Sequence, residues 1–323
     1  MQIVVGKNFQ RHIIPHLCIM RKLRKICQAY RALPNGYYHL CTDGWKEGVL
    51  FNNDHQYVAG VTSIALMKLK CNVEIYAYVL MPNHVHIILS GTGSDCTDAF
   101  KLLVRRCSLM RKKAGAPPIP KDYGFKLIPI DTPESFRSHI LYVARNPYEK
   151  GLSVPGGYLW GSDHLLFNPH GERIRGIRAD SIAMNEILRI AECPDKLPGH
   201  WEIHPEFGIL PRNFVKTDKV KALFRTPKNF VTRLVKDYET LLHISSDLKD
   251  EIMLSDMEID DIFYLQIRKM FPGKTLYNLS IEEKYRLAKH LKEQFPIEPA
   301  ELAVRLKLSE RTVNQALNAK EHW

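Results

Sequence analysis

Residues 81–90 read MPNHVHIILS, and this stretch decides the fold expected of the chain. It predicts a buried strand, because its apolar residues are mostly β-branched: Val85, Ile87, Ile88 and Leu89. His84 and His86 interrupt this strand with one residue between them. Side chains alternate faces along a strand, so both imidazoles lie on the same side. Since an unpaired polar group is costly inside a protein, the two rings need a reason to be there.

The segments around this strand predict an α+β domain. Further strands are expected at YYHLCT (37–42), NVEIYAYVLM (72–81) and GFKLIPI (124–130), and helices at 54–70, 95–113 and 132–146. Thr132 and Pro133 are typical of a helix start, and Pro147 predicts its end. The first six elements follow the split βαβ order. The sequence therefore predicts a ferredoxin-like antiparallel sheet with helices on one face, to which the helix 132–146 is an addition.

The chain is long enough for more than one domain. We expect a basic N-terminal extension at 1–35, the sheet domain at 36–150, an irregular connecting segment at 151–215 and a helical domain at 216–323. Helical periodicity occurs near 219–242, 258–270, 281–294, 298–306 and 309–318. The stretch 298–319 has the outline of a helix-turn-helix, and its outward residues would be Arg311, Thr312, Asn314 and Gln315. Helical hairpins that bind no DNA give the same pattern.

Composition indicates the class of partner. The formal net charge of +11 on 323 residues favours a polyanion, most often nucleic acid. The seven cysteines are scattered without a CxxC pair, which argues against a zinc ribbon or a disulfide framework and fits the cytoplasm. No apolar stretch approaches the roughly 20 residues that span a bilayer, so no membrane partner is expected.

Two imidazoles on one strand face offer adjacent nitrogen ligands for a divalent ion. The pattern alone is weak, since about 0.6 such pairs arise by chance among 14 histidines, and two half-exposed surface histidines would look the same. Tyr142 and Asn146 are four residues apart on the helix 132–146, so they lie one above the other at its boundary. A boundary tyrosine and a helix-ending asparagine would also give this spacing. His139, one turn earlier, is interpreted as a polar boundary residue.

MPNHVHIIL followed by YVARNPYEKGL resembles the HUH single-tyrosine transposases, most of all the REP-associated tyrosine transposases. The resemblance covers residues 37–167, including GYLWGSDHLLF after the tyrosine helix. It implies that His84, His86 and Asn146 are ligands of a divalent metal ion, Mg²⁺ or Mn²⁺, and that Tyr142 is the nucleophile. It further implies cleavage and rejoining of single-stranded DNA through a 5′-phosphotyrosine. Relatives often have a basic residue after the first strand, where this chain has Asp43, so a phosphate contact there is in doubt.

The expected partner is single-stranded or hairpin DNA, with flanking duplex DNA as a further partner of the helix-turn-helix. A basic outer face on the helix 95–113 would follow the phosphates through Lys101, Arg105, Arg106 and Lys112, although such a face is usually just solvated. Two other functions stay open: a domesticated, non-catalytic DNA-binding regulator, and a nickase of the replication-initiator or relaxase type. The chain could act as a monomer or a homodimer.

Overall fold

The computed structural model describes residues 26–44, 48–120, 123–236, 244–245, 247–248 and 256–318. It divides into two compact units, residues 1–244 and residues 245–323. Of the basic extension expected at 1–35, residues 1–25 lie outside the described residues. Its last part is helical at 26–31, where Arg31 donates to the Ser94 hydroxyl (2.7 Å) and pairs with Asp98. In the described part of the chain, no helix has the length and apolar character to cross a membrane.

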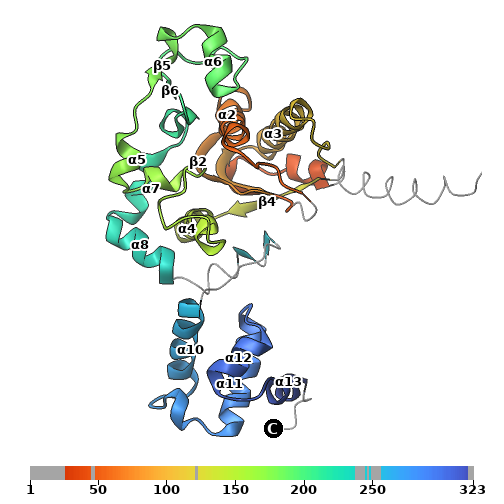
Figure 1. The fold of residues 1–323 in the computed structure, drawn as a ribbon, viewed down its shortest axis with the longest axis vertical. Helices are drawn as coiled ribbons and strands as arrows, with labels where there is room; N and C mark the ends of the chain where they lie inside the picture. Colours follow the sequence, from red (N-terminus) through yellow and green to blue (C-terminus); the bar gives the residue numbers. More distant parts are fainter. Residues whose placement is uncertain are drawn as a thin grey trace, which may run out of the picture. The chain divides into compact units, whose positions relative to one another are not determined.

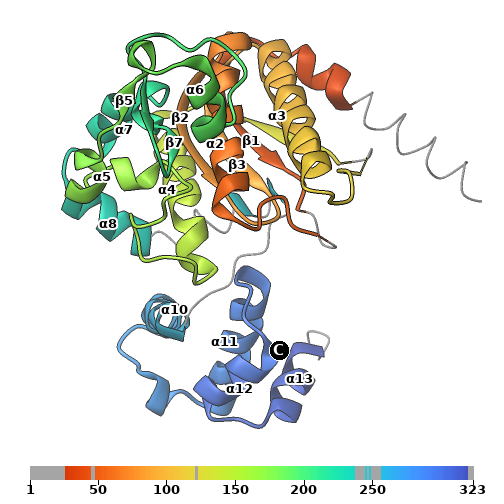
Figure 2. The same cartoon turned by 45° about the horizontal axis from the view of Figure 1, so that its top comes forward.

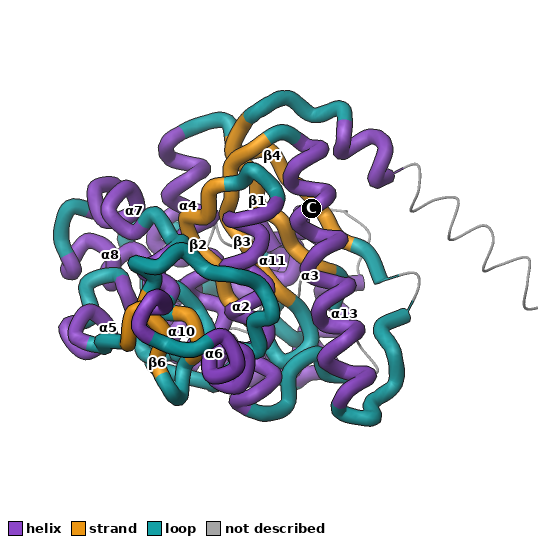
Figure 3. The backbone as a smooth tube through the Cα atoms, turned by 90° about the horizontal axis from the view of Figure 1, so that it is seen from above, coloured by secondary structure: helices purple, strands orange, loops and turns teal. Residues whose placement is uncertain are grey.

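The first unit is built on a four-stranded sheet that consists of β1 (Gly36–Thr42), β2 (Glu74–Leu80), β3 (Val85–Gly91) and β4 (Phe125–Ile130). The four strands lie side by side in the order β2-β3-β1-β4 (Figure 3). Every neighbouring pair is antiparallel. The expected α+β class with an antiparallel sheet is thereby confirmed. The register places Cys41 opposite His86 and His39 opposite Ile88, so β1 runs directly beside the histidine strand.

Two helices cover one face of this sheet. They are α2 (Asp54–Lys70), which Asn53 caps, and α3 (Gly93–Lys113), which begins with a Thr92–Asp95 capping box. Alternate residues of the strands point toward them and form the main core with them, among them Leu40 of β1 and Ile87 of β3. The intervening residues, including His39 and His86, therefore point to the other face.

The helix α4 (Pro133–Glu149) covers that other face. Its Phe136 ring packs edge-on against Tyr37 of β1 and Tyr76 of β2, with centroids 5.0 and 5.3 Å apart. Figure 1 shows the sheet between α4 and the pair formed by α2 and α3. The expectation of helices on one face holds for α2 and α3, whereas α4 adds a layer on the opposite side.

The segment expected to be irregular, 151–215, forms small elements. They are α5 (Pro169–Arg173), α6 (Met184–Ala191), the strands β5 (Ile177–Arg178), β6 (Glu202–His204) and β7 (Gly208–Ile209), and 3₁₀ turns at Asp163–Leu165, Ala179–Ser181 and Pro211–Asn213. The three strands form a second antiparallel sheet, beside which α6 lies (Figure 2). Trp201, Ile203 and Ile209 join the main core, so this segment belongs to the first unit.

Two further helices complete the first unit: α7 (Thr217–Phe224) and α8 (Pro227–Lys236). The single helix expected near 219–242 is therefore divided, because Arg225 adopts a positive φ of 63° and ends α7; residues 237–242 lie outside the described residues. Arg145 of α4, which is 1% exposed, pairs with Glu149 and donates to the Leu234 carbonyl of α8 (2.7 Å). These contacts join α7 and α8 to α4, which explains a division after residue 244 instead of the expected 215.

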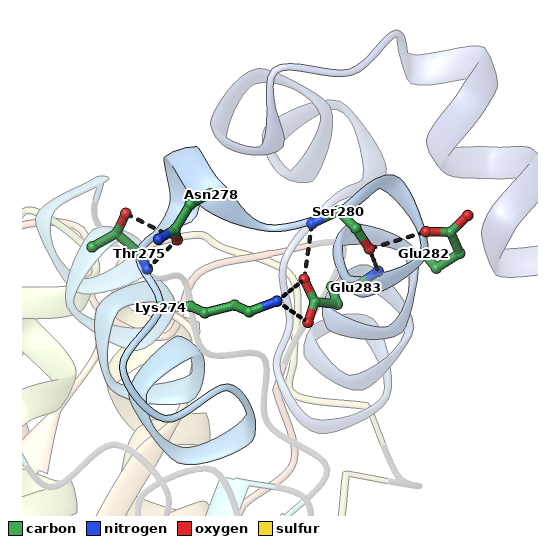
Figure 4. A network of polar contacts seen from close by, with 6 residues as sticks. All are labelled: Lys274, Thr275, Asn278, Ser280, Glu282 and Glu283. Atoms are coloured by element: carbon green, nitrogen blue, oxygen red, sulfur yellow. Dashed lines mark hydrogen bonds and ion pairs between the residues drawn. The ribbon is translucent and has the colours of Figure 1, made fainter.

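The second unit is helical. It contains α10 (Asp256–Met270), α11 (Ile281–Gln294), α12 (Pro299–Leu306) and α13 (Glu310–Asn318), with a 3₁₀ turn at Leu276–Asn278. Two capping boxes follow one another between α10 and α11: Thr275 with Asn278, and Ser280 with Glu283. Figure 4 shows Lys274 reaching Glu283 as well, with Nζ 2.6 and 2.8 Å from its two carboxylate oxygens. The connection between α10 and α11 is thus held by its own side chains.

Candidate functional site

The two motif histidines come from the hairpin between β2 and β3. Leu80 pairs with Val85, and the Met81 amide donates to the His84 carbonyl (2.9 Å), so Pro82 and Asn83 form a two-residue loop. His84 therefore lies immediately before β3 and His86 lies within it. Their rings meet nearly perpendicular, with centroids 4.7 Å apart, as their shared strand face requires.

The helix α4 brings Tyr142 to the same place. Thr132 caps this helix by accepting from the Ser135 amide (3.0 Å), and Pro133 occupies its first turn, as the sequence indicated. From α4, the Tyr142 ring packs against His86 with centroids 5.4 Å apart. The Tyr142 phenol lies far in the sequence from the imidazoles of His84 and His86, yet the three rings form one cluster between the sheet and α4.

Asn146 lies one turn beyond Tyr142 and is 3% exposed. Its amide nitrogen donates to the Tyr142 carbonyl (3.0 Å), so the amide oxygen is the atom suited to a metal ion. The sequence predicted that α4 would end here, which is wrong: the helix runs through Pro147 to Glu149. The Lys150 amide still bonds the Asn146 carbonyl (3.3 Å), so the hydrogen-bonding pattern resumes after the proline.

His39 of β1 is a member of this cluster that the sequence did not reveal. It is fully buried, and its Nε2 lies 3.1 Å from Nδ1 of His86. Its Nδ1 lies 2.8 Å from Nδ1 of His139, which is also buried and not merely at the helix boundary. The only sequence signal was a third imidazole in the apolar strand YYHLCT. It gains meaning only once the pairing of β1 with β3 is known.

Burial controls the charge of this cluster. Desolvation, reinforced by the neighbouring imidazoles of His86 and His139, lowers the pKa of His39 well below its ordinary value. Burial likewise lowers the pKa of His139 to about 4, with His86 adding to the shift. Both rings are therefore neutral at pH 7. Tyr142 and His84 are only 2% and 5% exposed, so a phosphate reaches them only if neighbouring side chains move.

The residues predicted to bind DNA on α3 lie elsewhere. Lys101, Arg105 and Lys112 are exposed, but α3 covers the sheet face opposite to the histidines. Arg106 differs from these three: its guanidinium donates to the Ser63 hydroxyl (3.1 Å) and to the Glu192 carbonyl (2.9 Å). It therefore connects α3 to α2 and to the end of α6, and a structural role explains it.

The predicted helix-turn-helix residues lie on α13. Arg311 and Gln315 are exposed, Thr312 and Asn314 are half-buried, and Val313 is fully buried. Ser309 begins the helix by accepting from the Thr312 amide (3.1 Å), and its hydroxyl lies 2.6 Å from that of Thr312. The Thr312 side chain is thus engaged in the cap, whereas Arg311 and Gln315 face solvent.

Asp43, the departure after the first strand, has a structural partner. Its carboxylate accepts from the Gly124 amide (3.0 Å), and its own amide donates to the Gly124 carbonyl (2.9 Å). Asp43 therefore continues the pairing of β1 and β4 beyond the strand ends. This contact accounts for an acidic residue at the position.

The donor types of the expected ligands His84, His86 and Asn146 fit a divalent ion. Across the described ranges, no group of three or more His, Cys, Asp and Glu side chains is arranged to hold a metal. The expected set differs, because it consists of two imidazoles and one amide oxygen. Nδ1 of His84 lies 2.8 Å from the Asn83 amide oxygen, and Nδ1 of His86 faces His39. Contacts at Nδ1 are the usual way in which proteins orient metal-binding histidines through Nε2.

Comparison with known proteins gives one structural likeness. No protein-family model and no curated protein matches the chain. A solved structure described as "Structure of the REP associates tyrosine transposase bound to a REP hairpin" is similar over 43% of this chain and 82% of that chain, with 18% identity and a TM-score of 0.35. Because the sequence identity and the TM-score are low, this likeness carries no argument about function, which depends on the chemistry of the site.

Proposed function

We propose that the first unit is a metal-dependent tyrosine transposase that nicks and rejoins single-stranded, hairpin-associated DNA. One observation carries the proposal: the Tyr142 phenol packs on His86, whose ring is next to that of His84. The order of elements and the strand order β4-β1-β3-β2 support a ferredoxin-like HUH nuclease around this cluster. The functional assignment follows from the residues, since a fold alone hosts many activities.

His84, His86 and Asn146 would hold the metal ion. Two imidazole nitrogens and an amide oxygen suit Mn²⁺ or Mg²⁺, with water and phosphate oxygens as further ligands. When bound, such an ion would polarise the scissile phosphate and stabilise the charge that develops during cleavage.

Tyr142 would supply the nucleophile. Its phenol oxygen bonds to phosphorus, the bond from phosphorus to the 3′-oxygen breaks, and the 3′-oxygen leaves as a hydroxyl after it takes up a proton. The phenol proton passes to solvent or to a neighbouring base. The product is a 5′-phosphotyrosine. The 3′-hydroxyl of another strand then reverses the step and restores both a phosphodiester and the phenol, so that joining needs no ATP.

DNA would contact both units. Lys101, Arg105 and Lys112 would follow phosphates along α3, and Arg311 and Gln315 would contact duplex DNA from α13. Since α3 lies opposite the histidine cluster, its cations would hold DNA outside the cleavage site. They would contribute to affinity and leave the chemical step unchanged.

The test is a denaturing-gel assay for a covalent adduct. Single-stranded hairpins from the DNA that flanks this gene, labelled at either end, are incubated with Mn²⁺ or Mg²⁺ and with wild type or Tyr142→Phe. We expect a metal-dependent adduct on the fragment 3′ of the cut, which Tyr142→Phe lacks. Phenylalanine keeps the buried ring and removes only the hydroxyl, so folding is preserved. Tight binding of the hairpin without any adduct would instead favour the non-catalytic regulator.

A further inference from the structure

His39 lies between a proposed metal ligand and a second buried imidazole. Its Nε2 is 3.1 Å from Nδ1 of His86, and its Nδ1 is 2.8 Å from Nδ1 of His139. The three rings come from β3, β1 and α4, so the chain of contacts crosses from the sheet to the helix that carries Tyr142. No sequence motif marks His39.

The two motif histidines differ in what fixes their protons. Nδ1 of His84 lies 2.8 Å from the Asn83 amide oxygen, which only accepts hydrogen bonds, so this Nδ1 carries the proton. Nε2 of His84 then has a lone pair suited to a metal ion. Nδ1 of His86 instead faces the His39 imidazole, which is able to accept or to donate. The tautomer of His86 is therefore decided by His39.

Each neutral imidazole has a single ring proton, and this leaves two arrangements of the chain. In the first, Nδ1–H of His86 donates to Nε2 of His39, and Nδ1–H of His39 donates to His139. In the second, every hydrogen bond is reversed and the proton of His86 is on Nε2, which excludes metal binding there. His39 and His139 are both buried away from water, which disfavours a charged ring at either position.

We propose that His39 is a positioning residue that holds His86 in the metal-binding tautomer, by accepting from Nδ1–H of His86 and donating to His139. This inference rests on the proposed function, since it presupposes an ion at Nε2 of His86. Its physical basis is general: the partner of the second imidazole nitrogen fixes the ring orientation and raises the basicity of the ligand nitrogen. Here that partner is the imidazole of His39, and the hydrogen bond of His39 to His139 determines which of its two nitrogens carries the proton.

The binding of Mn²⁺ alone, measured by electron paramagnetic resonance on the full chain, tests the proposal without any activity assay. His39→Phe retains a ring and removes both nitrogens, and we expect its Kd for Mn²⁺ to rise by roughly 10- to 100-fold. His39→Gln offers an amide oxygen to Nδ1–H of His86, so its Kd should stay within a few-fold of wild type. His200→Phe, the same change at an exposed histidine outside the cluster, should leave the Kd unchanged.

Two results would overturn the role of His39 while leaving the proposed metal site intact. One is an unchanged Kd in folded His39→Phe. The other is a proton on Nε2 of His86 in the metal-free protein, read from ¹⁵N shifts of labelled histidines; we expect it on Nδ1. If His39→Phe fails to fold, the ¹⁵N measurement decides. Wild type that binds no Mn²⁺, equal to His84→Ala, would contradict the metal site itself.

Discussion

The two units of this chain differ in charge and in how they place polar groups. Residues 1–244 contain 34 Lys and Arg and 21 Asp and Glu, a balance of +13, whereas residues 245–323 contain 12 and 14, a balance of −2. The first unit buries a cluster of imidazoles and a phenol, whereas every histidine and tyrosine in the described part of the second unit is at least partly exposed. The positive charge that indicated a nucleic-acid partner therefore belongs to the unit with the chemical cluster. The helix-turn-helix outline does not account for it.

The largest expected effect tests whether the chemistry belongs to the first unit alone. His84→Ala/His86→Ala should lower adduct formation by about 10³-fold or more, because loss of the ion costs several kcal/mol of transition-state stabilisation. Arg311→Gln, in the second unit, should leave the rate at saturating DNA unchanged. Single-turnover adduct formation measures both. A slow Arg311→Gln under those conditions would mean that the second unit contributes to cleavage.

The second prediction addresses the independence of the two cores. Ile87 and Leu291 are both fully buried, one in each unit. Ile87→Ala should lower the unfolding free energy of the first unit by about 2–5 kcal/mol, and Leu291→Ala should do the same to the second. Calorimetry and urea unfolding with probes in each unit should show that each variant moves only its own transition. A common shift would indicate one cooperative unit.

A third difference concerns pH. Burial raises the pKa of Asp163, in the first unit, to about 7. The unfolded chain releases this proton near 3.8, so ionisation of Asp163 destabilises the folded unit as pH rises from about 4 to about 7. In the second unit, the Lys274 ammonium lowers the pKa of Glu283, whose stabilising contribution is lost as pH falls below its ordinary value of 4.5.

Asp163→Asn, which imitates the protonated acid, isolates the first of these effects. At pH 7.5 we expect the variant to exceed wild type in unfolding free energy of the first unit, on the order of 2 kcal/mol, and the difference should shrink toward pH 5. The buried His39 and His139 act in the opposite direction on acidification, but they are common to both proteins. Equal unfolding curves at pH 7.5 would contradict the raised pKa.

The fourth prediction concerns which of the two units contacts the phosphates of the DNA. Lys101→Gln/Arg105→Gln/Lys112→Gln should reduce the slope of log affinity against log salt by about 2 for single-stranded DNA, since each lost contact removes roughly 0.7. A charge-matched control in the second unit is Arg268→Gln/Lys269→Gln/Arg286→Gln, at three exposed positions. Filter binding of a labelled hairpin at salt concentrations from about 50 to about 300 mM measures both slopes. Equal slopes in the two variants would show that α3 is an ordinary solvated face.

Much of the first unit could be predicted from local pattern. The residues of α2, the Thr132 cap and the shared face of His84 and His86 follow from periodicity and capping preferences, which depend on near neighbours in the chain. The extension of α4 through Pro147 could not be predicted, because tertiary contacts, including those of Arg145 with α8, stabilise its last turn.

The parts that sequence could not supply depend on pairing over long distances. His39 acquires its role from the register of β1 with β3 and from α4, about 100 residues away. The short strands of 151–215 carry little alternation of their own and are fixed by packing on α2. Arg106 was expected to one side of a basic face and to bind DNA with it, yet its partners Ser63 and Glu192 lie far away in the sequence. In each case the missing information was the identity of a distant neighbour.

The smallest expected effect compares two capping boxes of the same design. In the first unit, the Asp95 amide donates to the Thr92 hydroxyl (3.1 Å) and the Thr92 amide donates back to the Asp95 carboxylate (3.2 Å). In the second, the Glu283 amide donates to the Ser280 hydroxyl (3.2 Å) and the Ser280 amide to the Glu283 carboxylate (2.8 Å). Thr92→Ala and Ser280→Ala each remove the hydroxyl acceptor.

Each alanine should therefore lower the unfolding free energy of its own unit by about 1 kcal/mol and leave the transition of the other unit unchanged. Glu283 also pairs with Lys274, and Ser280→Ala leaves in place both this contact and the backbone amide of residue 280, so the Glu283 carboxylate keeps both partners. Lys274→Met combined with Ser280→Ala should then destabilise the second unit slightly more than Ser280→Ala alone, because an ion pair in contact with solvent contributes little. Urea unfolding of the single and double variants measures the increment. A zero increment would mean that the capping box alone holds the connection between α10 and α11.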